Sequence, residues 1–369
     1  MKFSCEKTLL QAAITTASRT VPNKSTIAAL EGLLLQANQN LTISGYNMQT
    51  GIRTTIDANI TEPGTLVLNS RLFGDIIRKL PDDILTFTSD TKMNVKLTCG
   101  DTFFEIQALS AEDYPDLPEV EDQYNVTVRQ NTLRTMISQT AFAVSNLETR
   151  PIHTGSLFEI TENRLTIVSV DGFRLALRRE KLENFEGGAF HFVAPGAALN
   201  EVEKICSDSD EIAVITLGNR HILFEIGQTQ LICRRLEGEF LDYKSAIPRS
   251  NPITLTVEKR GMINSIDRVS VVISEKQKSP VRCIFDENKV FMSTKTANGE
   301  AKDICRVNGN GKNLEIGFNH RYLMEALKYA PADEVKMELN TGISPCIIVP
   351  TQGEENFLYM VLPVRLKNN

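Results

Sequence analysis

The sequence contains no hydrophobic run that could span a membrane, since none approaches the ~18 consecutive apolar residues that a transmembrane helix needs. Its first residues turn polar and acidic at once, so there is no signal-peptide hydrophobic region and the cytoplasm is the expected compartment. The seven cysteines are scattered, and no two of them form a C-x-x-C pair. This spacing excludes a zinc ribbon and a thioredoxin-type site. Buried, reduced thiols are expected instead.

Familiar catalytic motifs are missing as well. None of the four histidines has a second histidine four residues away, which is the spacing of a helical metal site. Residues 309–312 lack the strand, loop and helix context of a phosphate-binding loop, and no G-x-S-x-G element occurs. Carboxylates are abundant, but in an acidic protein paired carboxylates arise by chance on solvated faces. We therefore predict a protein without catalytic activity, cofactor or metal.

The charge balance disfavours a conventional nucleic-acid binder. The chain carries 40 basic and 46 acidic residues, a net charge of −6, whereas such binders are normally basic overall. DNA is not excluded, because the position of the charges matters more than their sum. Basic residues such as Arg71, Arg78 and Arg321 flank the apolar stripes of predicted helices. Ordinary solvated faces with weak salt bridges explain this pattern, and sequence-independent phosphate contact is the alternative.

A threefold internal repeat organises the chain. At ~150 residues per domain, its length suggests two or three domains. A short alternating strand runs into an amphipathic helix at residues 3–14, 126–137 and 255–266. Aligning Cys5, Val128 and Val257 also aligns two sets of apolar helix positions: Leu10, Leu133 and Met262, then Ile14, Ile137 and Ile266. Repeats of this size indicate three similar domains.

Each repeat contains a second strand followed by a helix. Residues 66–68, 191–193 and 314–316 precede apolar residues spaced three, four and seven apart, which is typical of one buried helix face. Asn69 with Ser70, and Asn319, stand where N-caps are expected.

The rest of each repeat alternates as strands do. The expected strands include residues 33–35, 41–43, 84–87 and 103–106, then 156–160, 165–168, 212–215 and 221–226, then 281–285, 289–292, 335–339 and 346–349. Turns at Asn298–Gly299 and at residues 308–311 are expected to separate such runs. The prediction is an α+β fold of three repeated domains, each with two helices on antiparallel sheets. The predicted domains are residues 1–121, 122–249 and 250–369, with boundaries at proline-rich stretches.

The segment from Asp171 to Leu175 has two interpretations. Asp-Gly is typical of a tight turn, with Phe173 and Leu175 entering the next strand. Alternatively, a rigid loop presents Phe173 and Arg174 to a partner. The residues alone favour the plain turn.

The sequence resembles the bacterial DNA polymerase III beta subunit, the sliding clamp family, along essentially its whole length. The resemblance is carried by the threefold repeat and by specific segments: Met1 to Phe3, Leu80–Pro81 closing a helix, Val170 to Leu175, Phe240 to Tyr243 before Ile247–Pro248, Gly317 to Asn319, and Tyr359 to Leu366. The D-G-x-R-L and Y-x-x-x-P-x-R-L elements are specific in combination.

The resemblance implies a DNA sliding clamp, a processivity factor and not an enzyme. In this family two subunits join head to tail, so that helices line a hole around duplex DNA and sheets form the outer shell. The implied partners are non-specific duplex DNA, the replicative polymerase catalytic subunit, an ATP-driven clamp loader and other proteins with a clamp-binding motif. An acidic rim with a mildly basic lining would reconcile the net charge with sliding on DNA.

Site residues are implied position by position. A hydrophobic pocket for partner peptides is implied at His153, Thr154, Val170, Gly172, Phe173, Arg174, Leu175, Leu241, Ala246, Met360, Leu362, Pro363, Val364 and Arg365. DNA contacts are implied at Lys24, Arg71, Arg78, Asn319 and Tyr322. The subunit interface is implied at Phe104 and Ile106 of one copy, facing Val272 and Ile273 of the other.

The residues add one expectation about the pocket. Met360, Leu362 and Val364 would share one face of a final strand and complete the groove with Val170 and Leu175. Two other hypotheses stay open from the sequence: an interaction scaffold that never meets DNA, and an enzyme with a carboxylate site between domains. A convergent basic surface would argue against the first, and a deep pocket of perturbed ionisable groups would support the second.

Overall fold

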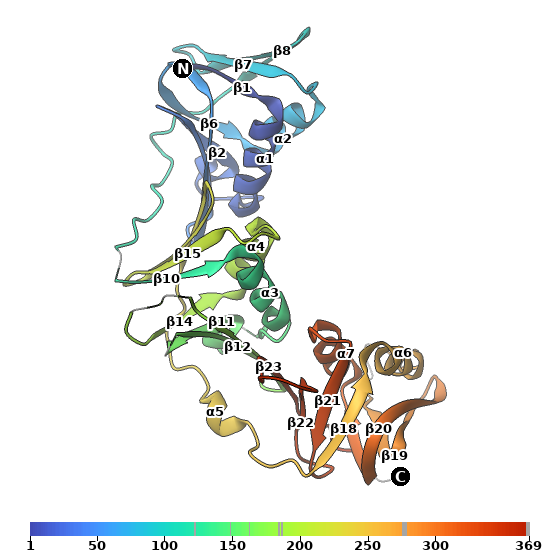
Figure 1. Ribbon diagram of the computed structural model, residues 1–369. Coiled ribbons are helices and arrows are strands. Elements are labelled where there is room, and N and C mark those ends of the chain that lie inside the picture. Colours follow the sequence, from blue (N-terminus) through green and yellow to red (C-terminus); the bar gives the residue numbers. More distant parts are fainter. Residues whose placement is uncertain are drawn as a thin grey trace. The chain divides into compact units, whose positions relative to one another are not determined.

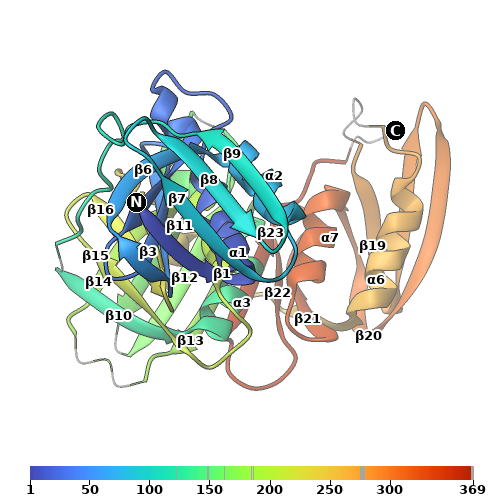
Figure 2. The same cartoon turned by 90° about the horizontal axis from the view of Figure 1, so that it is seen from above.

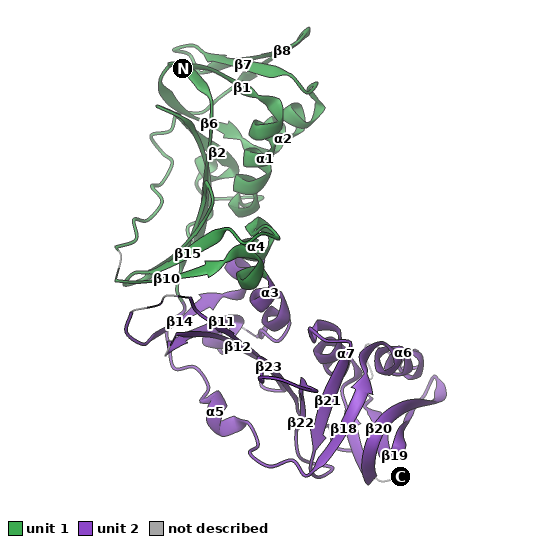
Figure 3. Cartoon of the chain, in the orientation of Figure 1, with its two compact units in different colours: residues 1–134, 201–235 green, residues 135–200, 236–369 purple. Residues whose placement is uncertain are grey.

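The computed structural model describes residues 1–121, 123–147, 149–161, 163–183, 185, 187–274 and 279–366. Asp122, at the first predicted boundary, and residues 367–369, at the end of the third predicted domain, lie outside the described residues, and the domain limits stay predictions. The chain forms two compact units, residues 1–134 with 201–235 and residues 135–200 with 236–369 (Figure 3). No helix in the described ranges is long and apolar enough to cross a membrane.

The first unit contains two antiparallel sheets, of five strands in the order β5-β1-β7-β8-β9 and of eight in the order β10-β15-β16-β17-β4-β3-β2-β6 (Figure 1). Their bounds are β1 Lys2–Glu6, β2 Gly32–Ala37, β3 Leu41–Tyr46, β4 Thr50–Ile56, β5 Asn59–Glu62, β6 Gly64–Asn69, β7 Ile84–Ser89, β8 Asn94–Cys99, β9 Thr102–Gln107, β10 Tyr124–Arg129, β15 Ile212–Leu217, β16 His221–Ile226 and β17 Thr229–Arg234. The pairing of β17 with β4 makes one sheet cross the first predicted domain boundary.

Helices α1 (Lys7–Ala17) and α2 (Ser70–Lys79) follow β1 and β6 directly and pack against each other. Leu10 and Ile14 of α1 and Phe73 of α2 enter one core with residues from both sheets. Asn69 caps α2 as predicted, since its Oδ1 accepts a hydrogen bond from the backbone N–H of Leu72 at 2.9 Å. Short 3₁₀ turns occupy Ser18–Thr20 and Ala28–Glu31.

The second unit is built on one antiparallel sheet of ten strands in the order β14-β11-β12-β13-β23-β22-β21-β18-β20-β19. Their bounds are β11 Gly155–Thr161, β12 Arg164–Val170, β13 Arg174–Lys181, β14 Phe190–Pro195, β18 Ile253–Glu258, β19 Val281–Thr296, β20 Gly299–Phe318, β21 Glu334–Leu339, β22 Cys346–Pro350 and β23 Phe357–Val361. Here β13 pairs with β23, so this sheet crosses the second predicted boundary.

Helices α6 (Lys259–Ser270) and α7 (His320–Tyr329) of the second unit lie side by side (Figures 1 and 2). Met262, Ile266 and Leu323 fill a core with the sheet, and Asn319 caps α7 as predicted by accepting from the N–H of Arg321 at 3.0 Å. Two further helices, α3 (Gln130–Ala141) and α4 (Gly196–Ile205), each have residues in both units. A 3₁₀ turn at Pro151–Thr154 precedes β11, and a short helix α5 (Tyr243–Ala246) lies in the segment before β18.

The predicted repeat is confirmed at the level of elements, because each predicted domain starts with a strand and helix and has a second strand and helix later. All seven cysteines are buried and none forms a disulfide, as expected. The turn predicted at residues 308–311 is wrong. There β20 continues through an irregular stretch in which Gly309 has φ of +134°, a conformation that glycine tolerates, so the strand bends without ending.

Candidate functional site

The turn from Asp171 to Arg174 joins β12 to β13 and is fixed by one carboxylate. Oδ1 of Asp171 accepts hydrogen bonds from the backbone N–H groups of Phe173 at 2.9 Å and Arg174 at 3.0 Å. Gly172 has φ of +89°, the left-handed region that glycine enters without strain. The predicted tight turn is confirmed, and it also leaves the Phe173 side chain 54% exposed.

An apolar cluster lies beside this turn. The pairing of β12, β13 and β23 sets Val170 opposite Leu175 and Leu175 opposite Met360, so residues far apart in sequence become neighbours. All three are buried in one cluster, and Leu362 packs against it partly buried. The backbone N–H of Leu362 donates to the carbonyl of Phe173 at 2.9 Å, which attaches the C-terminal segment to the turn. The structure therefore brings Val170, Leu175, Met360 and Leu362 together, and their role as a partner pocket stays a prediction.

The segment before β18 borders the same cluster. Tyr243 is a buried member, while Leu241 is 42% exposed and Ala246 is also exposed. The Tyr243 hydroxyl donates to Glu159 Oε2 at 2.6 Å, and Lys244 Nζ to Glu159 Oε1 at 2.8 Å. Burial alone would raise the pKa of the Glu159 carboxyl, but these two hydrogen bonds reverse the effect and lower it. Glu159 thus holds α5 against β11 and leaves Leu241 accessible.

His153 and Thr154 lie in the 3₁₀ turn before β11. The His153 ring meets the ring of Phe240 edge to face, with centroids 5.4 Å apart, so it lies against the same linking segment. Burial, reinforced by the nearby Arg150 cation, lowers the pKa of the imidazole. Thr154 Oγ1 donates to the carbonyl of Pro151 at 2.7 Å and stabilises the turn. A neutral imidazole therefore stands at the border of the cluster.

Arg174 faces inward, which corrects the expectation that the loop presents it to a partner. Its side chain is 10% exposed and forms an ion pair with Glu325 of α7. Nε donates to Asp171 Oδ2 at 2.9 Å, and Nη2 donates to the carbonyl of Phe142 at 2.6 Å. The guanidinium also lies 4.6 Å from the ring centroid of Tyr322, a cation–π distance. Arg174 therefore positions the turn, the end of α3 and the start of α7.

The C-terminal segment departs from the predicted strand. β23 ends at Val361, so Met360, Leu362 and Val364 do not form one continuous strand face. Val364 instead donates its N–H to the carbonyl of Gly317 at 2.8 Å and forms an isolated bridge there. Pro363 breaks the strand because it has no N–H to donate. Arg365 is exposed beyond it.

The five residues assigned to DNA contact fall into two places. Lys24, Arg71 and Arg78 are exposed in the first unit, and Arg78 pairs with Asp75 at 2.9 Å. Asn319 and Tyr322 begin α7, and the Tyr322 ring stacks on Phe173 with centroids 6.1 Å apart. The structure therefore brings Tyr322 to the apolar turn, a proximity that sequence spacing could not indicate.

The residues assigned to the subunit interface are half-buried. Phe104 and Ile106 on β9 pack partly against the core of the first unit, and Ile273 packs partly against that of the second. Val272 follows α6 and is also half-buried. Leu72, expected on the buried face of its helix, is instead 49% exposed, and Phe103, in the strand expected at the interface, is 56% exposed. The sequence analysis missed two further exposed apolar side chains, Val271 at 80% and Ile304 at 55%. Their signal was strong hydrophobicity at otherwise polar strand and helix positions.

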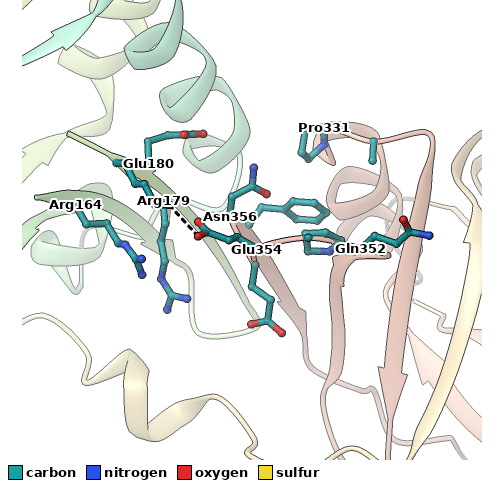
Figure 4. A pocket seen from close by; sticks show the side chains of 13 residues that line it. Arg164, Arg179, Glu180, Pro331, Gln352, Glu354 and Asn356 are labelled. Carbon is teal, nitrogen blue, oxygen red and sulfur yellow. Dashed lines mark hydrogen bonds and ion pairs between the residues drawn. The ribbon is translucent and has the colours of Figure 1, made fainter. Parts of the chain in front are cut away.

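Within the described residues, no group of three or more His, Cys, Asp or Glu side chains is arranged to hold a metal ion. A cavity of about 790 Å³ in the second unit is lined by both cations and carboxylates, several of them ion-paired (Figure 4). It contains no nucleophile with an adjacent base.

The family models that match the chain cover all three repeats. Models of the DNA polymerase III beta subunit match its N-terminal domain at residues 1–118, its central domain at 127–242 and its C-terminal domain at 244–365. The beta sliding clamp of Staphylococcus epidermidis is 31% identical over 99% of both chains, and that of Staphylococcus aureus is 30% identical over the same share.

Solved structures agree with this match. The DNA polymerase sliding clamp of Bacillus subtilis is 27% identical with a TM-score of 0.93, covering 100% of both chains. The beta subunit of Streptococcus pyogenes DNA polymerase is 26% identical with a TM-score of 0.93, covering 99% of this chain and 100% of that one. With three successive domain matches and near-complete coverage by these relatives, the chain belongs to the DNA polymerase III beta subunit family, the bacterial sliding clamps.

Proposed function

We propose that two copies of this sliding clamp close head to tail into a ring around duplex DNA, and that partner proteins bind at the apolar cluster beside Phe173. As a member of its family, the chain is a non-catalytic processivity subunit of DNA polymerase III. One observation carries the ring: the described residues form two strand junctions of the same kind and contain both halves of a third that stays unpaired.

The two closed junctions use equivalent strands. β4 pairs with β17, and β13 pairs with β23. These strands are equivalent because each repeat contains the same hairpin in the same register. One residue pair of that hairpin is Leu41 with Ile56 in the first repeat, Leu165 with Glu180 in the second, and Val290 with Cys305 in the third. Residues 299–306 of β20 therefore occupy the place of β4 and β13.

The same comparison identifies β9 as the other half. The pairs Val95 with Ile106, Ile222 with Cys233, and Ile348 with Tyr359 are equivalent, so β9 occupies the place of β17 and β23. Among the described residues, β9 pairs with β8 alone, and residues 299–306 pair with β19 alone. Two unpaired edges of a strand junction within one chain invite a second copy, and a two-fold axis closes such contacts into a ring.

Side chains on the two edges are complementary in one register. If β20 paired with β9 of a second copy in the register that joins β13 to β23, Lys302 would lie opposite Glu105 of the second copy. Ile304 would then lie opposite Phe103 of that copy. In the register that joins β4 to β17, Glu300 would instead lie opposite Glu105 of the second copy. Like charges directly opposite each other are unfavourable. The first register therefore fits better, and it sets two exposed apolar side chains against each other.

The helices offer a second complementary pair. Val271 stands at the repeat position of Phe142, and Leu72 at that of Tyr322. At the closed junction of the second unit, Phe142 and Tyr322 both contact the Arg174 guanidinium. An assembled ring would cover Val271 and Leu72 in the same way. The half-buried Phe104, Ile106, Val272 and Ile273 would then complete the interface core.

DNA contact in this proposal is weak and sequence-independent. Exposed Lys24, Arg71 and Arg78 would meet phosphates from the helix side, and a net charge of −6 limits the overall attraction. Tyr322 supports the peptide pocket more than DNA contact, because it stacks on Phe173, and Asn319 caps the helix that carries Tyr322.

The pocket proposed for partners has the anatomy of a peptide groove: an exposed aromatic ring, buried aliphatic residues and an accessible leucine. The expected occupants are the replicative polymerase catalytic subunit, the clamp loader and other clamp-binding proteins. The loader would supply ATP-driven opening in the cytoplasm.

Topological retention on DNA tests the ring. The protein loaded onto nicked circular DNA should stay bound at a salt concentration that abolishes binding to short linear duplexes, and cutting the circle should release it. Retention after linearisation, or no retention on the circle, would contradict encirclement. The latter would favour a scaffold that does not hold DNA.

A further inference from the structure

A basin lined by three cations and three carboxylates lies in the second unit, away from the turn at Phe173. The cavity of about 790 Å³ is lined by the ends of β12 and β13, by residues 352–356 and by Pro331 after α7 (Figure 4). Lys181 forms an ion pair with Glu354 at 2.9 Å, and Glu180 pairs with Arg178. Among the described residues, neither Arg164 nor Arg179 forms an ion pair with a carboxylate, although Glu355 also lines the cavity.

Strand register puts these cations together. Arg164 lies opposite Lys181, and Arg179 lies opposite Thr166, so Arg164 and Arg179 are diagonal neighbours, with Cα atoms roughly 7–8 Å apart. Figure 4 shows both side chains extending to the same side of the strands. Like charges placed opposite each other on a sheet are unfavourable unless an anion joins them. Glu354 forms an ion pair with Lys181, and the cations of Lys181 and Arg164 together lower the pKa of its carboxyl, so its charge acts on Arg164 as well.

The basin shares a sheet face with the proposed peptide pocket. Successive side chains of a strand alternate between faces. Leu175 and Leu177 belong to the pocket cluster, whereas Ala176 packs in the core with helices α6 and α7. Arg179 and Lys181 continue the face of Leu175, away from the helices. At about 3.3 Å per residue, Arg179 lies roughly 13 Å along the strand from Leu175.

We propose that Arg164 and Arg179 form an auxiliary site for carboxylates of an acidic segment in the same partner protein that fills the Phe173 pocket. This inference rests on the proposed function of the pocket. Guanidinium groups bind carboxylates in a planar, bidentate geometry, and two neighbouring ones suit a run of Asp or Glu. The location favours a protein over DNA, because the basin lies on the face opposite to the helices that would meet the duplex.

Paired peptides test the proposal. Both carry a pocket-binding segment of the polymerase catalytic subunit and a six-residue Gly/Ser spacer. One ends in four Asp residues and the other in four Ser residues, and a second pair carries the extension at the opposite end. On the wild-type dimer at low salt, calorimetry should show about fivefold to tenfold tighter binding of one Asp peptide. Arg164→Gln with Arg179→Gln should abolish that difference and leave the Ser peptide unchanged.

A matched control removes the same charge elsewhere in the unit. Arg249→Gln with Lys289→Gln, both away from the basin, should retain the difference between the peptides. Met360→Ala with Leu362→Ala should weaken both peptides, which tests the pocket separately from the basin. If neither Asp peptide binds more tightly, or if the gain survives loss of both arginines, the proposal is wrong. It is equally wrong if inorganic phosphate binds through the two arginines while the Asp extensions gain nothing.

Discussion

Reversing the charge of Lys302 should open the ring. In the proposed register, Lys302→Glu would replace attraction to Glu105 of the second copy with repulsion, and it would also break the exposed ion pair of Lys302 with Glu300. A cross-strand pair contributes roughly 0.2–1 kcal/mol, so changing its sign costs about 1 kcal/mol per junction. A two-copy ring contains the junction twice, and a total of about 2 kcal/mol raises the dimer dissociation constant about 30-fold.

Sedimentation velocity over a dilution series would measure this constant. Lys295→Glu is the matched control, because it makes the same charge change on β19, which lies on the far side of the hairpin from the proposed contact. It should leave the dimer intact. Adding Glu105→Lys to Lys302→Glu should restore most of the lost affinity. An unchanged dimer in the single variant, or no rescue in the double one, would refute the register.

Three further outcomes follow from the structure. Met360→Ala with Leu362→Ala should reduce partner-peptide affinity by at least about tenfold, since each buried methylene lost costs ~0.8 kcal/mol; normal binding by calorimetry would refute the pocket, and dimerisation should persist. Burial raises the pKa of the Cys283 thiol to about 12, so the cysteines of the folded protein should resist a thiol reagent at pH 8, and all seven should react in denaturant. The pKa of Glu159 is lowered in the folded state, so its contribution to stability is present above its unfolded-state pKa and is lost as the pH falls through its folded-state pKa. On acidification, the melting temperature of Glu159→Gln should therefore fall less than that of the wild-type protein.

The spacing of apolar residues predicted the repeated strand and helix, because each of these elements buries one face and its apolar residues recur with the period of that element. Asn69 and Asn319 were predictable as caps for a local reason, since the side chain binds a backbone N–H within three residues. The continuous strand through Gly309 was not predictable, because glycine and asparagine are typical of turns and it is pairing with β18 and β19 that keeps that segment extended.

The site was predictable in membership more than in orientation. Family resemblance predicted Phe173 and Met360 in one pocket, and strand register sets Met360 opposite Leu175, two residues after Phe173. The inward direction of Arg174 depends on Glu325 and the carbonyl of Phe142, which are distant in sequence. The contact of Tyr322 with Phe173 likewise joins residues that are distant in sequence, so no local sequence pattern predicts it.

Continuous sheets make the sequence repeat a poor unit for dissecting this protein. A fragment holding only the middle repeat would lose the partners of both β13 and β17 and expose two rows of backbone N–H and C=O groups. Such edges template aggregation. Cooperative unfolding is instead expected to follow the two compact units, each of which takes half of the middle repeat with it. The domain that recurs in the sequence and the body that folds are therefore different pieces of the same chain.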